Sequence, residues 1–190
     1  MNDFDVSYVA ATTTTHKSKS GFYFFGGLAL VALLAILFAN NFLQVFLIAT
    51  AFAAFNAAIR SYKSRLDFPL EVEVTTYATI AMTMAFGLKA GIFTGIWSGF
   101  WGDVFTGLTP YTPITLGSYV LAALLAMLFP TSMFVFAGIL ITVIITGVSW
   151  VLYNITGSFT PFENFMYSLT ELICNLYLFL ALPWIARFLF

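Results

Sequence analysis

Three acidic side chains occur where hydrophobic segments of the sequence begin or end. Glu73 opens one segment, Asp103 lies close to the end of the next, and Glu171 lies two turns into the last one. A carboxylate inside an apolar helical bundle is costly unless it has a partner or contacts water. These positions therefore indicate either residues that cap helices and reach the membrane interface, or the wall of a polar cavity.

The cavity interpretation gathers aromatic and polar residues near the same ends of the segments. The predicted ligand-binding residues are Glu73, Tyr77, Trp101, Asp103, Tyr111, Asn164 and Glu171. Catalysis is not expected, because the one histidine, His16, lies in a polar tail and no phosphate-binding P-loop occurs. We expect a small-molecule ligand, no enzymatic activity, no cofactor and no metal site.

Small residues repeat at intervals of four in two hydrophobic segments. On a helix, this spacing makes a face on which a second helix can approach closely. We expect these faces to pack helices together, either within the chain or against a partner subunit. The residues concerned are Ala53, Ala54, Ala57, Ala58, Gly87, Gly91, Gly95 and Gly99.

An aromatic ladder accompanies the glycines, displaced from them by two residues. Its members are Phe93, Trp97, Trp101 and Phe105. A displacement of two residues places the ladder on roughly the opposite face of the helix. This face is expected either to face lipid or, through Trp97 and Trp101, to line the polar cavity.

The composition is that of a membrane protein. Hydrophobic residues make up 61% of the 190 residues and charged residues 8%, whereas soluble domains carry roughly a quarter charged residues. The net charge of −1 provides no basic patch for nucleic acid. We expect a multi-pass protein of the cell membrane whose partners are the lipid bilayer and other membrane subunits.

Breaks in the hydrophobic pattern predict an all-α transmembrane bundle of seven helices, or six if the first pair is not two full crossings. The predicted helices span residues 22–39, 42–59, 74–88, 91–105, 114–129, 133–153 and 165–190. Residues 1–20 form a polar N-terminal tail, and residues 21–190 form a single transmembrane helical domain.

The connections between these helices alternate between the two sides of a membrane. The long polar connections, residues 60–70, 106–113 and 154–164, all fall on one side, and the short turns fall on the other. Because loops carry specificity more often than helices do, we expect one working face. Arg60, Lys63 and Arg65 occur together in the first long connection, so the positive-inside rule predicts that this face is cytoplasmic.

The stretch from Phe68 to Met127 resembles the membrane-embedded S components of energy-coupling-factor vitamin transporters. The resemblance rests on Phe86-Gly87-Leu88-Lys89-Ala90-Gly91, on the spaced glycines and on Gly102-Asp103. It implies a substrate-binding subunit for uptake of a micronutrient, which works with partner subunits. An Ala-x-x-x-Ala surface, from Ala53 to Ala57 or from Ala54 to Ala58, would contact the coupling subunit.

Two other functional classes remain open. The same stretch is similar to the rod-shape protein MreD, a non-enzymatic membrane scaffold, through Asp103-Val104-Phe105-Thr106-Gly107. An accessory subunit that packs around a larger membrane complex would explain the aromatic residues without any pocket.

Overall fold

The computed structural model describes residues 42–63, 72–157 and 160–190, which form helices joined by short connections, with no strand among them. The predicted all-α fold is therefore confirmed for this part of the chain. Leu43–Phe190 forms one compact unit. The polar tail, its boundary at residue 20, the helix predicted at 22–39 and the turn at Asn40-Asn41 lie outside the described residues.

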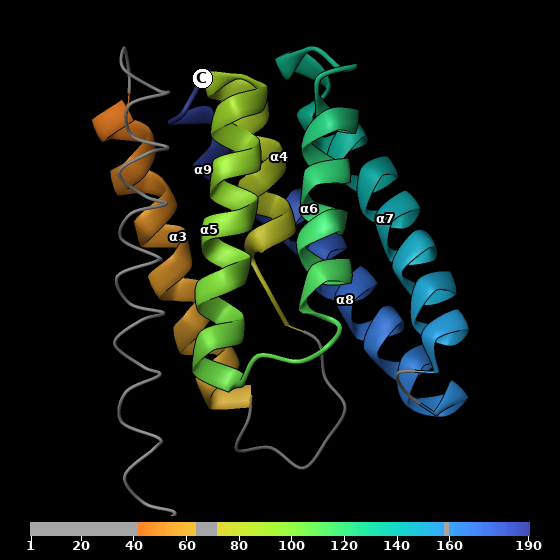
Figure 1. Ribbon diagram of the computed structural model, residues 1–190. Helices are drawn as coiled ribbons and strands as arrows, with labels where there is room; N and C mark the ends of the chain where they lie inside the picture. Colours follow the sequence, from red (N-terminus) through yellow and green to blue (C-terminus); the bar gives the residue numbers. More distant parts are fainter. Residues whose placement is uncertain (1–41, 64–71, 158–159) are drawn as a thin grey trace, which may run out of the picture. The chain divides into compact units, whose positions relative to one another are not determined.

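The described helices follow the predicted order along the chain (Figure 1). They are α3 (Phe42–Lys63), α4 (Thr75–Phe86), α5 (Leu88–Thr106), α6 (Thr112–Ala126), the 3₁₀ helix η1 (Thr131–Met133), α7 (Phe134–Thr156), α8 (Pro161–Ala181) and α9 (Pro183–Arg187).

The prediction that the last helix is continuous is wrong. Residues 165–190 were expected to form one helix, but α8 ends at Ala181 and the short α9 starts at Pro183. Proline has no backbone N–H and its ring clashes with the preceding turn, so it ends α8 and fits the first position of α9. The carbonyl of Leu182 at this break accepts a hydrogen bond of 2.7 Å from the Tyr77 hydroxyl.

Helix α4 lies at the centre of the bundle and packs against α5, α6, α7 and α8. All its residues from Thr75 to Thr83 are buried. The largest rings of the core meet beside it: Tyr77 lies 5.1 Å from Phe179 and 5.6 Å from Phe134 between ring centroids. These rings join α4 to α7 and α8, which are far from it in the sequence.

Glycines of α5 let α4 and α6 approach its backbone closely. A Cβ atom built on Gly95 would lie 2.8 Å from both Thr79 Oγ1 of α4 and Tyr119 Cβ of α6. A Cβ on Gly91 would overlap the Thr83 side chain, and one on Gly99 would overlap the Tyr119 ring. These three glycines therefore pack helices within the chain.

Gly87 has a different role from the other three. Its φ angle is +90° and open space surrounds the position of a Cβ, so it does not contribute to the close helix packing. A positive φ is strained for other residues. Gly87 instead makes the tight junction between α4 and α5, where a turn was predicted.

The start of α8 carries a capping box. The Thr160 hydroxyl accepts a hydrogen bond from the Glu163 backbone N–H, and the Glu163 carboxylate accepts one from the Thr160 backbone N–H. These arrangements satisfy amide groups that the first turn of a helix leaves open. Hydrogen bonds from the Thr160 hydroxyl and backbone lower the pKa of Glu163 from its ordinary value.

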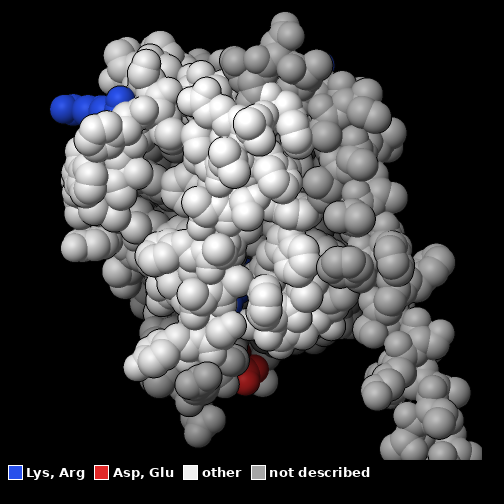
Figure 2. Space-filling view, turned by 90° about the vertical axis from the view of Figure 1, so that its left-hand side faces the viewer, with Lys and Arg blue, Asp and Glu red and all other residues white. Residues whose placement is uncertain are grey.

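Within the described part of the chain, two helical stretches are long and apolar enough to cross a membrane, judged by length and composition. They are Phe42–Tyr62 and Thr131–Thr156, and Thr112–Ala126 is a shorter apolar helix. Figure 2 shows a described surface on which charged groups occupy only small areas at the edges and in one crevice. These features agree with a membrane protein.

Replacement of Gly95 by leucine tests the close packing of α5. The added side chain meets Thr79 and Tyr119, and overpacking of this kind costs about 1–3 kcal/mol. We expect Gly95→Leu to lower the unfolding temperature and the yield of folded protein in detergent. Gly117→Leu in α6 is the control, because open space surrounds a Cβ at that position. Equal stability of the two variants would contradict the packing described here.

Candidate functional site

A buried arginine joins three helices at one end of the bundle. Arg60 lies in the last turn of α3, and only 8% of its surface is exposed. One of its guanidinium nitrogens, Nη2, lies 3.0 Å from Glu73 Oε2, and the other, Nη1, pairs with Asp103 Oδ1 of α5. We call Arg60, Glu73, Asp103 and Tyr119 the charged cluster.

Glu73 receives hydrogen bonds from three directions. Besides Arg60, the hydroxyl of Tyr119 from α6 donates to its Oε2 atom. The hydroxyl of Thr76 donates to Oε1 over 3.1 Å. A buried carboxylate is stable only when such donors compensate its lost hydration. Glu73 is 3% exposed, so this set of donors replaces water around it.

The helix dipoles favour two of the three charges in the cluster and disfavour the third. A helix end with free carbonyl groups favours cations, and an end with free N–H groups favours anions. Arg60 lies at the C-terminal end of α3, and Glu73 lies just before the N-terminal end of α4. Asp103 lies in the last turn of α5, where the dipole disfavours it, so its pairing with Arg60 is the interaction that stabilises it there.

A second layer of polar contacts lies next to the charged cluster. Asn56, one turn before Arg60, donates from Nδ2 to the Ser98 carbonyl over 3.3 Å and accepts from the Val74 backbone N–H over 3.4 Å. The hydroxyls of Thr75 and Ser98 lie 3.1 Å apart. These contacts fix α3, the start of α4 and the middle of α5 relative to one another.

Gly102 makes the room that this arrangement needs. A Cβ atom at this position would lie 2.6 Å from Asn56 Nδ2 and 2.9 Å from Arg60 Cδ. A side chain here would push α3 away from α5. The Gly102-Asp103 pair thus provides a close approach and a carboxylate in consecutive residues.

Seven ligand-binding residues were predicted. The described contacts bring two of them together, Glu73 and Asp103, because both pair with Arg60. Tyr77 lies one turn after Glu73, but its hydroxyl bonds to Leu182 near α9. Trp101 is half-buried and lies in the aromatic ladder of α5.

The remaining predicted residues lie on or near α6, α7 and α8. Tyr111 packs edge-on against Tyr153 with a ring separation of 6.3 Å. Asn164 is buried and donates to the Trp150 carbonyl over 3.1 Å. Glu171 is half-buried, and its carbonyl accepts a hydrogen bond from Asn175.

The expectation for Arg60 was wrong. It was placed in a polar loop with Lys63 and Arg65 and counted as a topology signal, but it is a buried helical residue with two carboxylate partners. Lys63 ends α3, and Arg65 lies outside the described residues. The positive-inside argument therefore loses one of its three charges.

Sequence reasoning also missed Asn56 and Tyr119 as members of the site. A usable signal existed for the first, since Asn56 and Arg60 are polar residues four positions apart, on one face of a mostly apolar helix. Tyr119 gives no comparable signal, because its partner Glu73 is 46 residues away and no local pattern connects them.

The aromatic ladder of α5 packs partly against α3, although lipid or the polar cavity was expected beside it. The Phe46 ring of α3 lies 6.3 Å from Phe93 and 6.0 Å from Trp97. The indole N–H of Trp97 donates to the Thr50 hydroxyl over 3.3 Å. Phe105 at the end of the ladder is exposed, as expected.

The predicted alanine surface of α3 divides between two faces. Ala53 and Ala57 are buried in the bundle, whereas Ala54 and Ala58 are exposed. Only the second pair remains on the surface for contact with another subunit.

The cluster can pair charges and exchange hydrogen bonds, and its groups are those that recognise a polar or charged ligand. Among the described residues, no group of three or more His, Cys, Asp or Glu side chains could hold a metal ion.

A double-mutant cycle tests the energetic link between α3 and α5. Removal of one partner from a buried ion pair costs about 3–5 kcal/mol, because the other charge is left uncompensated. We expect Arg60→Gln and Asp103→Asn each to lower the free energy of unfolding in detergent, and the double variant to lose less than their sum. Lys89→Gln, a neutralised exposed cation, combined with Asp103→Asn should be additive. Additive losses for the Arg60–Asp103 pair would contradict the described contact.

No protein-family model, curated protein or solved structure matches this chain. The resemblances to S components and to MreD therefore remain hypotheses that rest on the sequence motifs alone.

Proposed function

We propose that this protein is a multi-pass membrane protein that binds a small polar ligand for a micronutrient uptake transporter and works with partner subunits. The observation that carries the proposal is the charged cluster, in which Arg60, Glu73 and Asp103 are buried among apolar helices. Charged residues inside membrane bundles are expensive, and they usually mark ligand or ion sites.

The cluster is suited to the exchange of partners. A ligand with a carboxylate could take the place of Asp103 at Arg60, and a ligand with an amine could take the place of Arg60 at the carboxylates. In each exchange the group that stays at the site keeps a charge-assisted partner, whereas the displaced side chain loses its own. The long connection 106–113, on the same side of the bundle, would cover a ligand bound there.

A scaffold or accessory subunit is the second candidate function, favoured by the apolar surface of α7. Nine large apolar side chains along this helix are exposed. They are Phe136, Leu140, Val143, Ile144, Val148, Trp150, Val151, Leu152 and Ile155. Lipid or another membrane subunit could cover this surface, and in a scaffold the charged cluster would serve packing alone.

Cysteine labelling tests the multi-pass arrangement. In a background that lacks Cys174, single cysteines at Thr109 and Phe162 should react with a membrane-impermeant reagent from the same side. Cysteines at Lys89 and Ser132 should react only from the opposite side. All four positions are exposed at ends of helices or in connections. Labelling of Thr109 and Ser132 from one side would rule out the proposed crossing of α6.

Ligand retention distinguishes the two candidate functions. Native mass spectrometry of the protein purified in mild detergent should detect a retained small molecule. Asp103→Asn keeps the side-chain volume but removes the charge, so the folded fraction should lose affinity for a ligand bound through an amine about ten- to hundredfold, as for a charge-assisted hydrogen bond.

Glu163→Gln is the matched control for this experiment. It makes the same charge change near the same end of the bundle, but Glu163 is exposed and a glutamine can keep the capping box. If Asp103→Asn leaves ligand retention intact and instead releases partner subunits, the scaffold function replaces the transporter function.

A further inference from the structure

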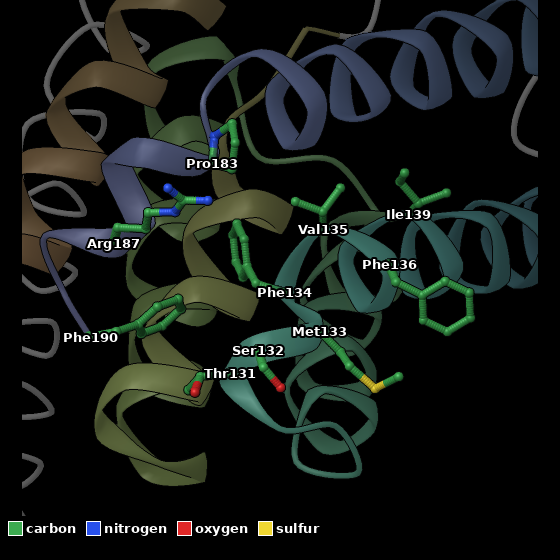
Figure 3. Close-up of a pocket in the computed structure, with 10 residues that line it drawn as sticks. All are labelled: Thr131, Ser132, Met133, Phe134, Val135, Phe136, Ile139, Pro183, Arg187 and Phe190. Carbon is green, nitrogen blue, oxygen red and sulfur yellow. The ribbon is translucent and has the colours of Figure 1, made fainter.

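A second feature lies at the other end of the bundle, between the start of α7 and the short α9. It is a cavity of about 640 Å³, within the range usual for sites that hold small molecules. Its lining comes from η1, the first turns of α7, α9 and the last residue (Figure 3). None of the charged-cluster residues contributes to it.

The cavity has one charged side chain, and that side chain is a cation. Arg187 extends its guanidinium group toward the part of the cavity formed by Pro183 and Phe134 (Figure 3). No Asp or Glu lines the cavity, and no described carboxylate forms an ion pair with Arg187. Thr131 and Ser132 add two hydroxyl groups beside the N-terminal end of the 23-residue α7. The helix dipole adds positive potential at that end, so the polar side of the cavity suits an anion.

The rest of the lining is apolar. Phe134, Val135 and Ile139 follow one another along the first turns of α7, and the ring of Phe190 lies 5.6 Å from that of Phe134. A small inorganic anion would leave this surface without a partner. An amphiphile with an anionic head and a hydrocarbon chain would match both sides of the cavity.

The depth of the cavity in a membrane agrees with such an occupant. Thr131–Thr156 is one of the two candidate spans, so Thr131 and Ser132 would lie at the bilayer surface, at the level of lipid headgroups. Trp184 is exposed on α9, next to Pro183 of the lining. Exposed tryptophan is typical of the membrane interface, and an arginine at this depth reaches toward headgroup phosphates.

We propose that this cavity binds an anionic phospholipid of the surrounding bilayer, with the phosphate at Arg187 and one acyl chain along Phe134, Val135 and Ile139. The inference rests on the membrane embedding in the proposed function but not on the transported ligand. The lipid would fasten α9 to the start of α7 and so stabilise the end of the bundle opposite the charged cluster.

A lipid titration tests the proposal on the full chain, purified in a non-ionic detergent and stripped of lipid. Native mass spectrometry should show one phosphatidylglycerol molecule bound more tightly than phosphatidylcholine. Arg187→Gln should weaken phosphatidylglycerol binding about tenfold or more, by loss of a charge-assisted contact. Lys89→Gln is the matched control, because it removes an exposed cation outside the cavity. This variant should bind phosphatidylglycerol as tightly as the unsubstituted chain does.

Two further measurements distinguish a bound lipid from other occupants of the cavity and from nonspecific electrostatic attraction. Ile139→Phe fills part of the apolar side and should weaken both lipids, whereas glycerol phosphate without acyl chains should not compete. Any of three results would overturn the proposal. Arg187→Gln could bind phosphatidylglycerol as tightly as the unsubstituted chain, or Arg187→Gln and Lys89→Gln could lose the same affinity for it. The third is full competition by glycerol phosphate. Extraction of the chain from membranes by alkaline carbonate without detergent would instead show that the membrane embedding itself is wrong.

Discussion

The ion pairs of Arg60 are the interaction on which the candidate site depends. They connect the end of α3 to the start of α4 and the end of α5, three helix ends that no short-range contact brings together. Buried charges lose the stabilisation of water, and only well-placed partners restore it. Glu73 just before α4 and Asp103 of α5 are these partners, and Tyr119 of α6 donates a hydrogen bond to Glu73, so a change in any of these segments alters the environment of the arginine.

The glycines of α5 make this arrangement possible. Gly91, Gly95 and Gly99 allow α4 and α6 to approach the α5 backbone, and Gly102 leaves room for Asn56 and Arg60 of α3. Larger residues would increase the distances between helices, and side chains as short as Asp103 and Glu73 could not then reach one arginine. The charge pairing in the cluster therefore depends on the close helix packing that these glycines allow.

Much of the fold follows from local features of the sequence. The predicted helices at 74–88, 91–105 and 133–153 correspond to α4, α5 and α7, because long apolar segments ended by Gly or by polar residues have few alternatives. The break at Pro183 was also open to prediction, since proline inside a helix removes a hydrogen bond. Gly87 shows the limit of spacing arguments, because its place in the four-residue repeat does not reveal its positive φ.

The site was less predictable than the helices. Glu73 and Asp103 were expected near the same side of the bundle because connections alternate in direction, and the structure joins them through Arg60. That arginine was assigned to a loop because Arg60-Ser61-Tyr62-Lys63 is locally polar, and polarity alone does not show where a helix ends. Whether an arginine is solvated or buried depends on partners 13 and 43 residues away, which no local pattern contains.

The most direct test of the account is a distance measurement by solid-state NMR on the full chain in lipid bilayers. Labels on the guanidinium nitrogens of arginine and on the side-chain carboxylates of Asp and Glu would report the separation within the cluster, with Arg60→Gln used to assign the signal. The account predicts strong dipolar coupling, at nitrogen-to-carbon separations of about 3–4 Å, that disappears in Arg60→Gln. A folded chain without coupling from Arg60 to either the Asp103 or the Glu73 carboxylate would contradict it.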